Sequence, residues 1–131
     1  MKIRYKCPQG HVFNGDENTK VCAECGQPLA TDGCGAVQLY RMGNMMGMAV
    51  GMGIYIDGEP YGHLANKESI RIVLPFGTHT VHMTHTSTRN CNDPQFTITP
   101  EAPLAFMKAH FGAMGFKIIV EPAKPEEMPP V

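Results

Sequence analysis

The sequence predicts an all-β protein: a small N-terminal unit followed by an antiparallel β-sandwich of about seven or eight short strands. The first observation behind this prediction is a pair of short turns within residues 1–30, each with cysteine or histidine at its ends. The second is a series of short segments across residues 36–121 in which apolar and polar residues alternate. Turn residues separate these segments about every eight to twelve positions, as in many β-sandwiches.

The N-terminal unit, residues 1–30, is poor in apolar residues. Residues 3–6 and 11–13 are predicted strands, and the segment 14–18 is rich in residues that favour turns. Units of fewer than about 40 residues usually need a disulfide, a metal or a partner chain to fold. We therefore expect a metal to hold this unit together, because its apolar residues are few: Ile3, Tyr5, Val12, Phe13, Val21 and Leu29.

Four potential metal ligands lie at the ends of the two short turns. The first turn runs from Cys7 to His11, and the second runs from Cys22 to Cys25. Three thiolates and one imidazole form a ligand set typical of closed, tetrahedral structural zinc sites. The spacing predicts one structural Zn²⁺ per chain, bound by Cys7, His11, Cys22 and Cys25, with no coordination position left for catalysis.

The ligand set has one alternative. Cys34 lies nine residues beyond Cys25 in a segment of small and polar residues, and it could replace His11 as the fourth ligand. A redox role for the Cys22–Cys25 pair is disfavoured, because no βαβ pattern surrounds it.

The remaining chain divides by composition into a linker at 31–35, the β-sandwich at 36–121 and a Pro- and Glu-rich tail at 122–131. We expect the tail to be disordered or loosely docked. Asp57-Gly58 predicts a tight hairpin turn. Segment 104–111 is assigned to a strand, although its composition also suits a helix. The expected strands are 37–41, 53–56, 61–64, 69–74, 78–86, 95–99, 104–111 and 116–120.

Two segments resemble known families. Residues 5–29 look like a bacterial zinc ribbon, through the Cys-x3-His and Cys-x2-Cys turns. Residues 54–82 resemble PEGA-like β-sandwich domains, in which a VDG-x-x-x-G-x-L hairpin precedes a PPG-x-H-x-V turn and strand. Phe76 stands where that family commonly has proline or glycine. The second resemblance implies a non-catalytic module, often associated with a cell surface or envelope.

Composition restricts the compartment and the partners. The net charge of −1 gives no overall basic surplus for non-specific binding to nucleic acid. The first six residues contain no apolar run, so we expect no signal peptide and a cytoplasmic location in which the five cysteines stay reduced. We also expect no membrane span, because no apolar run reaches 18 residues.

Histidines gather on the predicted strand 78–86. His79 and His85 share one face of this strand with Val81 and Met83, and His82 lies on the opposite face. We expect these imidazoles on a polar, solvated sheet face. The alternative is a second metal site that also recruits His63 or His110.

The segment Met42–Met52 is rich in methionine and glycine. We expect a loop or an irregular edge strand, with a protein-contact surface, including self-association, as an alternative. Thioether sulfurs also suit Cu(I), which is the remaining possibility.

No nucleophile elbow, phosphate-binding loop or paired carboxylate predicts catalysis. The expected function is a non-enzymatic, zinc-binding adaptor that meets an unknown protein partner through a sheet edge or through Met42–Met52. The first alternative is a nucleic-acid-binding zinc ribbon that uses Lys2, Arg4 and Lys6, although four basic residues face three acidic ones within residues 1–30. The second is a metal sensor or chaperone that uses methionines and histidines of the β domain.

Overall fold

The computed structural model describes residues 2–43, 50–112 and 117–129 as an all-β fold, which confirms the predicted fold class. Within these ranges no helix has the length and apolarity that a membrane crossing requires. The strands are β1 (Ile3–Lys6), β2 (Val12–Gly15), β3 (Cys34–Arg41), β4 (Met52–Ile56), β5 (Glu59–Leu64), β6 (Ser69–Pro75), β7 (Gly77–Thr84), β8 (Gln95–Ile98), β9 (Leu104–Phe111) and β10 (Ile118–Pro122), and a 3₁₀ turn, η2, spans Pro125–Glu127.

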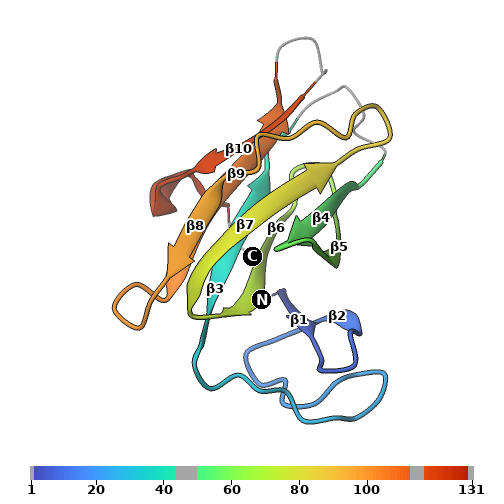
Figure 1. The fold of residues 1–131 in the computed structure, drawn as a ribbon, viewed down its shortest axis with the longest axis vertical. Coiled ribbons are helices and arrows are strands. Elements are labelled where there is room, and N and C mark those ends of the chain that lie inside the picture. Colours follow the sequence, from blue (N-terminus) through green and yellow to red (C-terminus); the bar gives the residue numbers. More distant parts are fainter. Residues whose placement is uncertain (1, 44–49, 113–116, 130–131) are drawn as a thin grey trace.

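The strands form two sheets (Figure 1). The first has the order β10-β9-β3-β6-β1-β2, and the second has the order β5-β4-β7-β8. Most neighbours are antiparallel, as the sequence predicts, but β1 with β6 and β3 with β9 are parallel. The parallel pairs join segments far apart in the chain, so the alternation within a single strand could not indicate them.

The core lies between the two sheets. Alternate residues of β6 point into it, and Ile70, Ile72 and Leu74 are at most 1% exposed. β4 and β7 supply the opposite side, with Ile54 and Met83 equally buried. Segment 104–111 is confirmed as a strand, β9, because its residues 107, 109 and 111 are buried in this core at a spacing of two.

The first strands of the chain belong to the same sheet as the β-sandwich. β1 pairs with β6 in the register Ile3↔Arg71 and Arg4↔Ile72. In Figure 1, β1 and β2 (dark blue) continue the sheet beside β6. β3 begins at Cys34, so the last two residues of the expected linker 31–35 are in a strand. The N-terminal unit therefore extends the six-stranded sheet.

Basic side chains of β1 cover the outer edge of β5. The Arg4 guanidinium donates hydrogen bonds to the backbone oxygens of Tyr61 at 3.1 Å and His63 at 2.7 Å. Lys6 donates to the backbone oxygen of Pro60 at 3.2 Å. Burial lowers the pKa of Arg4, against the opposing effect of the Glu68 carboxylate, but the side chain stays charged. These contacts use carbonyl groups that an exposed edge strand would offer to another chain.

Arg4→Ala should loosen the N-terminal strands from β5. The variant leaves the carbonyls of Tyr61 and His63 without their donor, which should lower the free energy of unfolding by about 1–3 kcal/mol. Urea denaturation measures this change, and amide exchange should become faster in β5. Lys2→Ala is the matched control, since Lys2 makes an exposed ion pair with Glu68 that contributes at most about 1 kcal/mol. Equal losses in the two variants would contradict the role given to Arg4.

The C-terminal tail is docked through its described residues, up to 129. Residue 122 ends β10, and Ala123 N–H donates to the backbone oxygen of Phe106 at 2.9 Å. Lys108 donates to Glu127 at 3.1 Å, and the Gln38 amide donates to the backbone oxygen of Pro129 at 3.2 Å. Polar contacts with β3 and β9 therefore dock the tail over residues 122–129.

The expectation of a solvated histidine face is wrong for His79 and His85. These residues are 7% and 8% exposed, because their face of β7 is the core face. The His79 ring lies 2.6 Å from an Asp57 carboxylate oxygen through Nδ1 and 2.7 Å from the Pro75 carbonyl through Nε2. Burial favours the neutral Asp57 carboxyl, but the contact with His79 and the Thr80 N–H outweigh it and lower the pKa of Asp57.

Asp57 also confirms the predicted hairpin turn. Asp57 and Gly58 both have positive φ, at 53° and 82°, and they connect the paired residues Ile56 and Glu59. This left-handed pair is the backbone of a tight turn that matches the strand twist.

Candidate metal centre

The first half of the candidate site is the turn from Cys7 to His11, which joins β1 to β2. Cys7 N–H donates to the His11 carbonyl at 3.0 Å, and Gly10 N–H donates to the Cys7 carbonyl at 2.8 Å. Gly10 has a φ of 91°, a conformation that glycine adopts without steric cost. This turn brings the side chains of Cys7 and His11 to the same side of the chain.

The second half is the turn from Cys22 to Gly26. Gly26 N–H donates to the Cys22 carbonyl at 3.0 Å, and Cys22 N–H donates to the Gln27 carbonyl at 2.8 Å. Glu24 N–H points at the Cys22 sulfur, 3.4 Å away. Backbone N–H groups directed at a sulfur stabilise its thiolate, which is the form that binds a metal.

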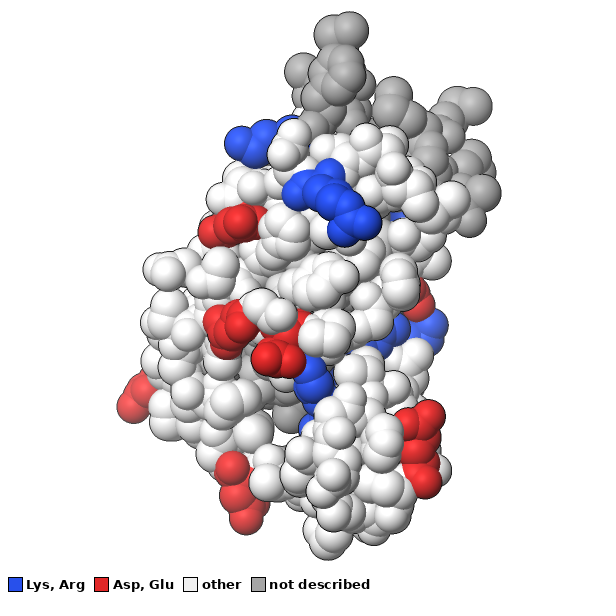
Figure 2. Space-filling view, turned by 45° about the vertical axis from the view of Figure 1, so that its right-hand side comes forward, with Lys and Arg blue, Asp and Glu red and all other residues white. Residues whose placement is uncertain are grey.

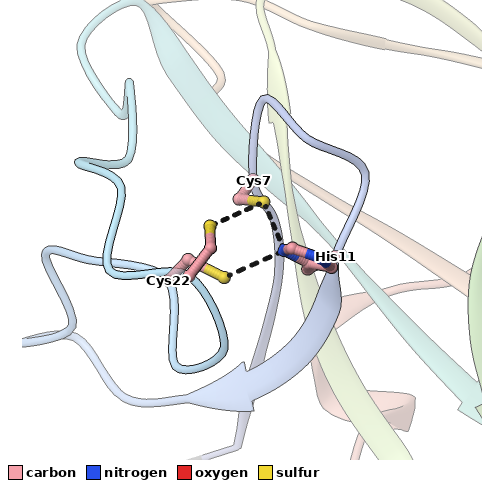
Figure 3. A group of neighbouring side chains, drawn as sticks. Cys7, His11 and Cys22 are labelled. Carbon is pink, nitrogen blue, oxygen red and sulfur yellow. Dashed lines mark hydrogen bonds between the residues drawn. The ribbon is translucent and has the colours of Figure 1, made fainter.

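The four side chains Cys7, His11, Cys22 and Cys25 meet in one cluster, as the sequence predicts. We call it the Cys₃His cluster. Their ligand atoms all lie within 4.8 Å of one another. Figure 3 shows Cys7, His11 and Cys22 directed toward a common point. Cys7 Sγ lies 3.3 Å from His11 Nδ1 and 3.8 Å from Cys25 Sγ, and Cys22 Sγ lies 3.7 Å from His11 Nδ1.

These separations have the size of the edges of a zinc tetrahedron. Sulfur at about 2.3 Å and nitrogen at about 2.0 Å from one zinc ion, at tetrahedral angles, lie about 3.5 Å apart. Two such sulfurs lie about 3.8 Å apart. The three separations given above are therefore close to those around a four-coordinate ion, and the remaining ones are within 4.8 Å.

The pKa values of Cys22 and Cys7 in the cluster are lowered, which favours the thiolate form that binds a metal. Burial raises the pKa of the Cys22 thiol, but the N–H groups of Cys25 and Glu24 lower it more, to about 6. The pKa of Cys7 is lowered in the same way, by the N–H groups of His11 and Gln9 acting against burial. The Cys22 sulfur raises the pKa of His11. Cys7 and Cys22 therefore favour the thiolate form that binds a metal. For Cys25 the Gln27 N–H lowers the pKa, but burial and the sulfurs of Cys22 and Cys7 raise it more.

Glu24 is a residue that the sequence reasoning missed. Its carboxylate oxygen lies 3.9 Å from His11 Nε2, the ring nitrogen that faces away from the cysteines. At 3.9 Å this contact is too long for the hydrogen bond by which a carboxylate orients a ligating histidine, and Glu24 is the nearest described carboxylate that could rotate to form it. The position of Glu24 between Cys22 and Cys25 was the available signal.

Cys34 lies outside the Cys₃His cluster. It begins β3, and its thiol donates to the backbone oxygen of Ala30 at 3.5 Å. All five cysteines are free thiols. The structure thus places His11, and not Cys34, with the three other cysteines.

The methionine segment contributes little to the described surface. Met45, Met46 and Met48 lie outside the described residues. Met52 is 1% exposed in the core, and Met42 is 37% exposed beside β3. No cluster of potential metal ligands in the described chain includes His63 or His110.

Comparison with known proteins adds no relative. No protein-family model and no curated protein matches this chain. The cluster of four potential ligands within 4.8 Å of one another is therefore the main observation from which a function can be argued.

Proposed function

We propose that this protein is a non-enzymatic, zinc-stabilised adaptor that binds a protein partner. One observation carries the metal half of the proposal: three sulfurs and one imidazole nitrogen lie within 4.8 Å of one another, and the three closest separations given above are near the edge lengths of a zinc tetrahedron. Four protein ligands complete the shell of Zn²⁺, so the ion would stabilise the fold and would not act on a substrate. The resemblance of residues 5–29 to a zinc ribbon supports the same assignment.

A zinc ion bound by the Cys₃His cluster would stabilise the N-terminal strands. β1 carries Arg4 and Lys6, whose contacts cover the edge of β5. Few apolar contacts hold the loop between β2 and β3, and the Cys₃His cluster ties this loop to the end of β1. A bound ion would therefore fix β1 and β2 in the six-stranded sheet.

The edge of β8 is the surface that we assign to the partner. β8 is the outermost strand of the four-stranded sheet. Val81 N–H donates to the Pro94 carbonyl, and hydrogen-bonded pairs alternate along an antiparallel ladder. The backbone groups of Gln95 and Thr97 therefore face away from β7. An extended segment of a partner can add to such an edge through main-chain hydrogen bonds.

The nucleic-acid alternative has less support. Arg4 and Lys6 are bound to β5 carbonyls, and Lys2 pairs with Glu68. Figure 2 shows Lys and Arg side chains and Asp and Glu side chains scattered over the face in view, with wide areas between them. A phosphate backbone binds most strongly to a concentrated basic footprint.

A display library of unstructured peptides tests the proposed partner edge. The wild-type chain and Thr97→Val should retain the same peptides, because valine keeps the N–H that faces outward. Thr97→Pro removes that N–H and should weaken their binding at least tenfold, which is about 1.4 kcal/mol. Thermal unfolding checks that each variant is folded. A library that enriches no peptide, or peptides that bind Thr97→Pro equally well, would contradict the adaptor role. So would turnover of a simple ester by the chain.

A further inference from the structure

We propose that His82, Cys91 and Asp93 form a second metal site, separate from the Cys₃His cluster and open on one side. This inference goes beyond the proposed function. In that function the zinc of the Cys₃His cluster has four protein ligands, so it has no free coordination position for another molecule. The site would hold a second Zn²⁺ or a similar borderline-soft divalent ion.

The geometry brings three different donors together. His82 lies on β7, and Cys91 and Asp93 lie on the loop that leads from β7 to β8. Their ligand atoms all lie within 4.8 Å of one another. His82 Nδ1 and an Asp93 carboxylate oxygen are 2.6 Å apart. Small side-chain rotations would place all three atoms about 2.0–2.3 Å from one ion.

The loop is anchored on the side away from β7, so the donors are held in place. The Asn92 side chain donates to the Val120 carbonyl at 2.8 Å and accepts from Val120 N–H at 2.9 Å. Cys91 forms a β-bridge with Ile118. These contacts fix Asn92, which lies between the donors Cys91 and Asp93, to β10.

The loop is also anchored to β7 itself, since Val81 N–H donates to the Pro94 carbonyl at 3.1 Å. On the opposite side the Tyr55 ring lies 6.0 Å from the His82 ring. Asp93 adopts a φ of 49°, which turns its carboxylate back toward β7. A metal would thus meet a partly preorganised set of ligands, at a low cost in side-chain entropy.

The three donor types determine which metal ion the site would bind, and they leave one coordination position of that ion open. An imidazole nitrogen, a thiolate and a carboxylate suit Zn²⁺ or Co²⁺, and three protein ligands leave the fourth tetrahedral position for solvent. His82 lines a cavity of about 290 Å³ together with Tyr55, Gly58, Thr84 and Arg89. Cys91 and Asp93 do not line this cavity, so it reaches the proposed site only at the His82 ring.

Titration of the zinc-loaded full chain with Co²⁺ tests the second site. The wild type should bind one Co²⁺ per chain beyond the zinc, with a thiolate-to-cobalt charge-transfer band in the near ultraviolet. Cys91→Ser should lose that band, and Asp93→Asn should weaken Co²⁺ binding at least about tenfold. Cys34→Ser is the matched control, because Cys34 is a half-buried free thiol outside both clusters.

Native mass spectrometry of the same samples separates this proposal from the adaptor function. One zinc should stay bound in every variant, since none of them touches the Cys₃His cluster. A wild type that takes up no Co²⁺ beyond its zinc would overturn the second site, as would a band of equal strength in Cys91→Ser. Either result leaves the peptide-binding test of β8 unaffected, so the two proposals fail independently.

Discussion

Cys22→Ser should abolish tight zinc binding and unfold the N-terminal unit. Cys22 is 2% exposed, and its sulfur faces His11 at 3.7 Å inside the Cys₃His cluster. A serine hydroxyl is a poor zinc ligand at neutral pH. Structural zinc contributes about 10–16 kcal/mol to the folding of small zinc-finger peptides, far more than the few apolar contacts of residues 2–30 can replace.

Two measurements follow the effect of Cys22→Ser. Native mass spectrometry should show the loss of one zinc per chain, and amide exchange should show the loss of protection in β1 and β2. The strands of the four-stranded sheet should keep most of their protection, because their core residues lie far along the chain from the cluster. Cys34→Ser should retain the zinc and the protection of β1. A Cys22→Ser chain that keeps one zinc and a protected β1 would show that the cluster is not the stabilising site.

Ile72→Ala should cause a large loss of stability, because Ile72 is a fully buried core residue of β6. Ile72 is 0% exposed, and β6 lies between β3 and β1, with Ile72 opposite Val37 on one side and Arg4 on the other. Truncation removes buried methyl groups and leaves a cavity between the two sheets. The free energy of unfolding should fall by about 2–5 kcal/mol.

Chemical denaturation monitored by circular dichroism measures this loss. Val73→Ala is the matched control, because Val73 is the next residue of the same strand and its side chain is only half-buried on the opposite face. The control should cost well under half as much. Similar losses in both variants would contradict the placement of the core between the sheets.

The sequence predicted most of the local structure correctly. Alternation located the strands to within a few residues, and Asp57-Gly58 located a hairpin turn, because both patterns depend on near neighbours in the chain. The spacing of Cys7, His11, Cys22 and Cys25 also depends on two short turns, each closed by its own backbone hydrogen bonds. These features could therefore be predicted without knowledge of the rest of the fold.

The histidines of β7, together with His85 just beyond its end, show a limit of the sequence-based prediction. Alternation placed His79 and His85 on one face and His82 on the other, as the structure has them. The buried face could have been predicted, because Val81 and Met83 share it with His79 and His85, whereas the opposite face holds threonines and His82. The expectation of a solvated face gave too much weight to the polarity of imidazole, which is intermediate between buried and exposed residues. In the structure the second sheet packs on the face that holds Val81 and Met83.

The sequence by itself determined an all-β chain, its turns and a four-ligand cluster, since each follows from residues close together in the chain. Only the tertiary structure decided that β1 pairs with β6 and that Arg4 binds the edge of β5. The physical reason is that these contacts depend on how distant segments are brought together. Parallel pairing and the anchoring of a loop on β10 are set by the closure of the whole core, and no local pattern records them.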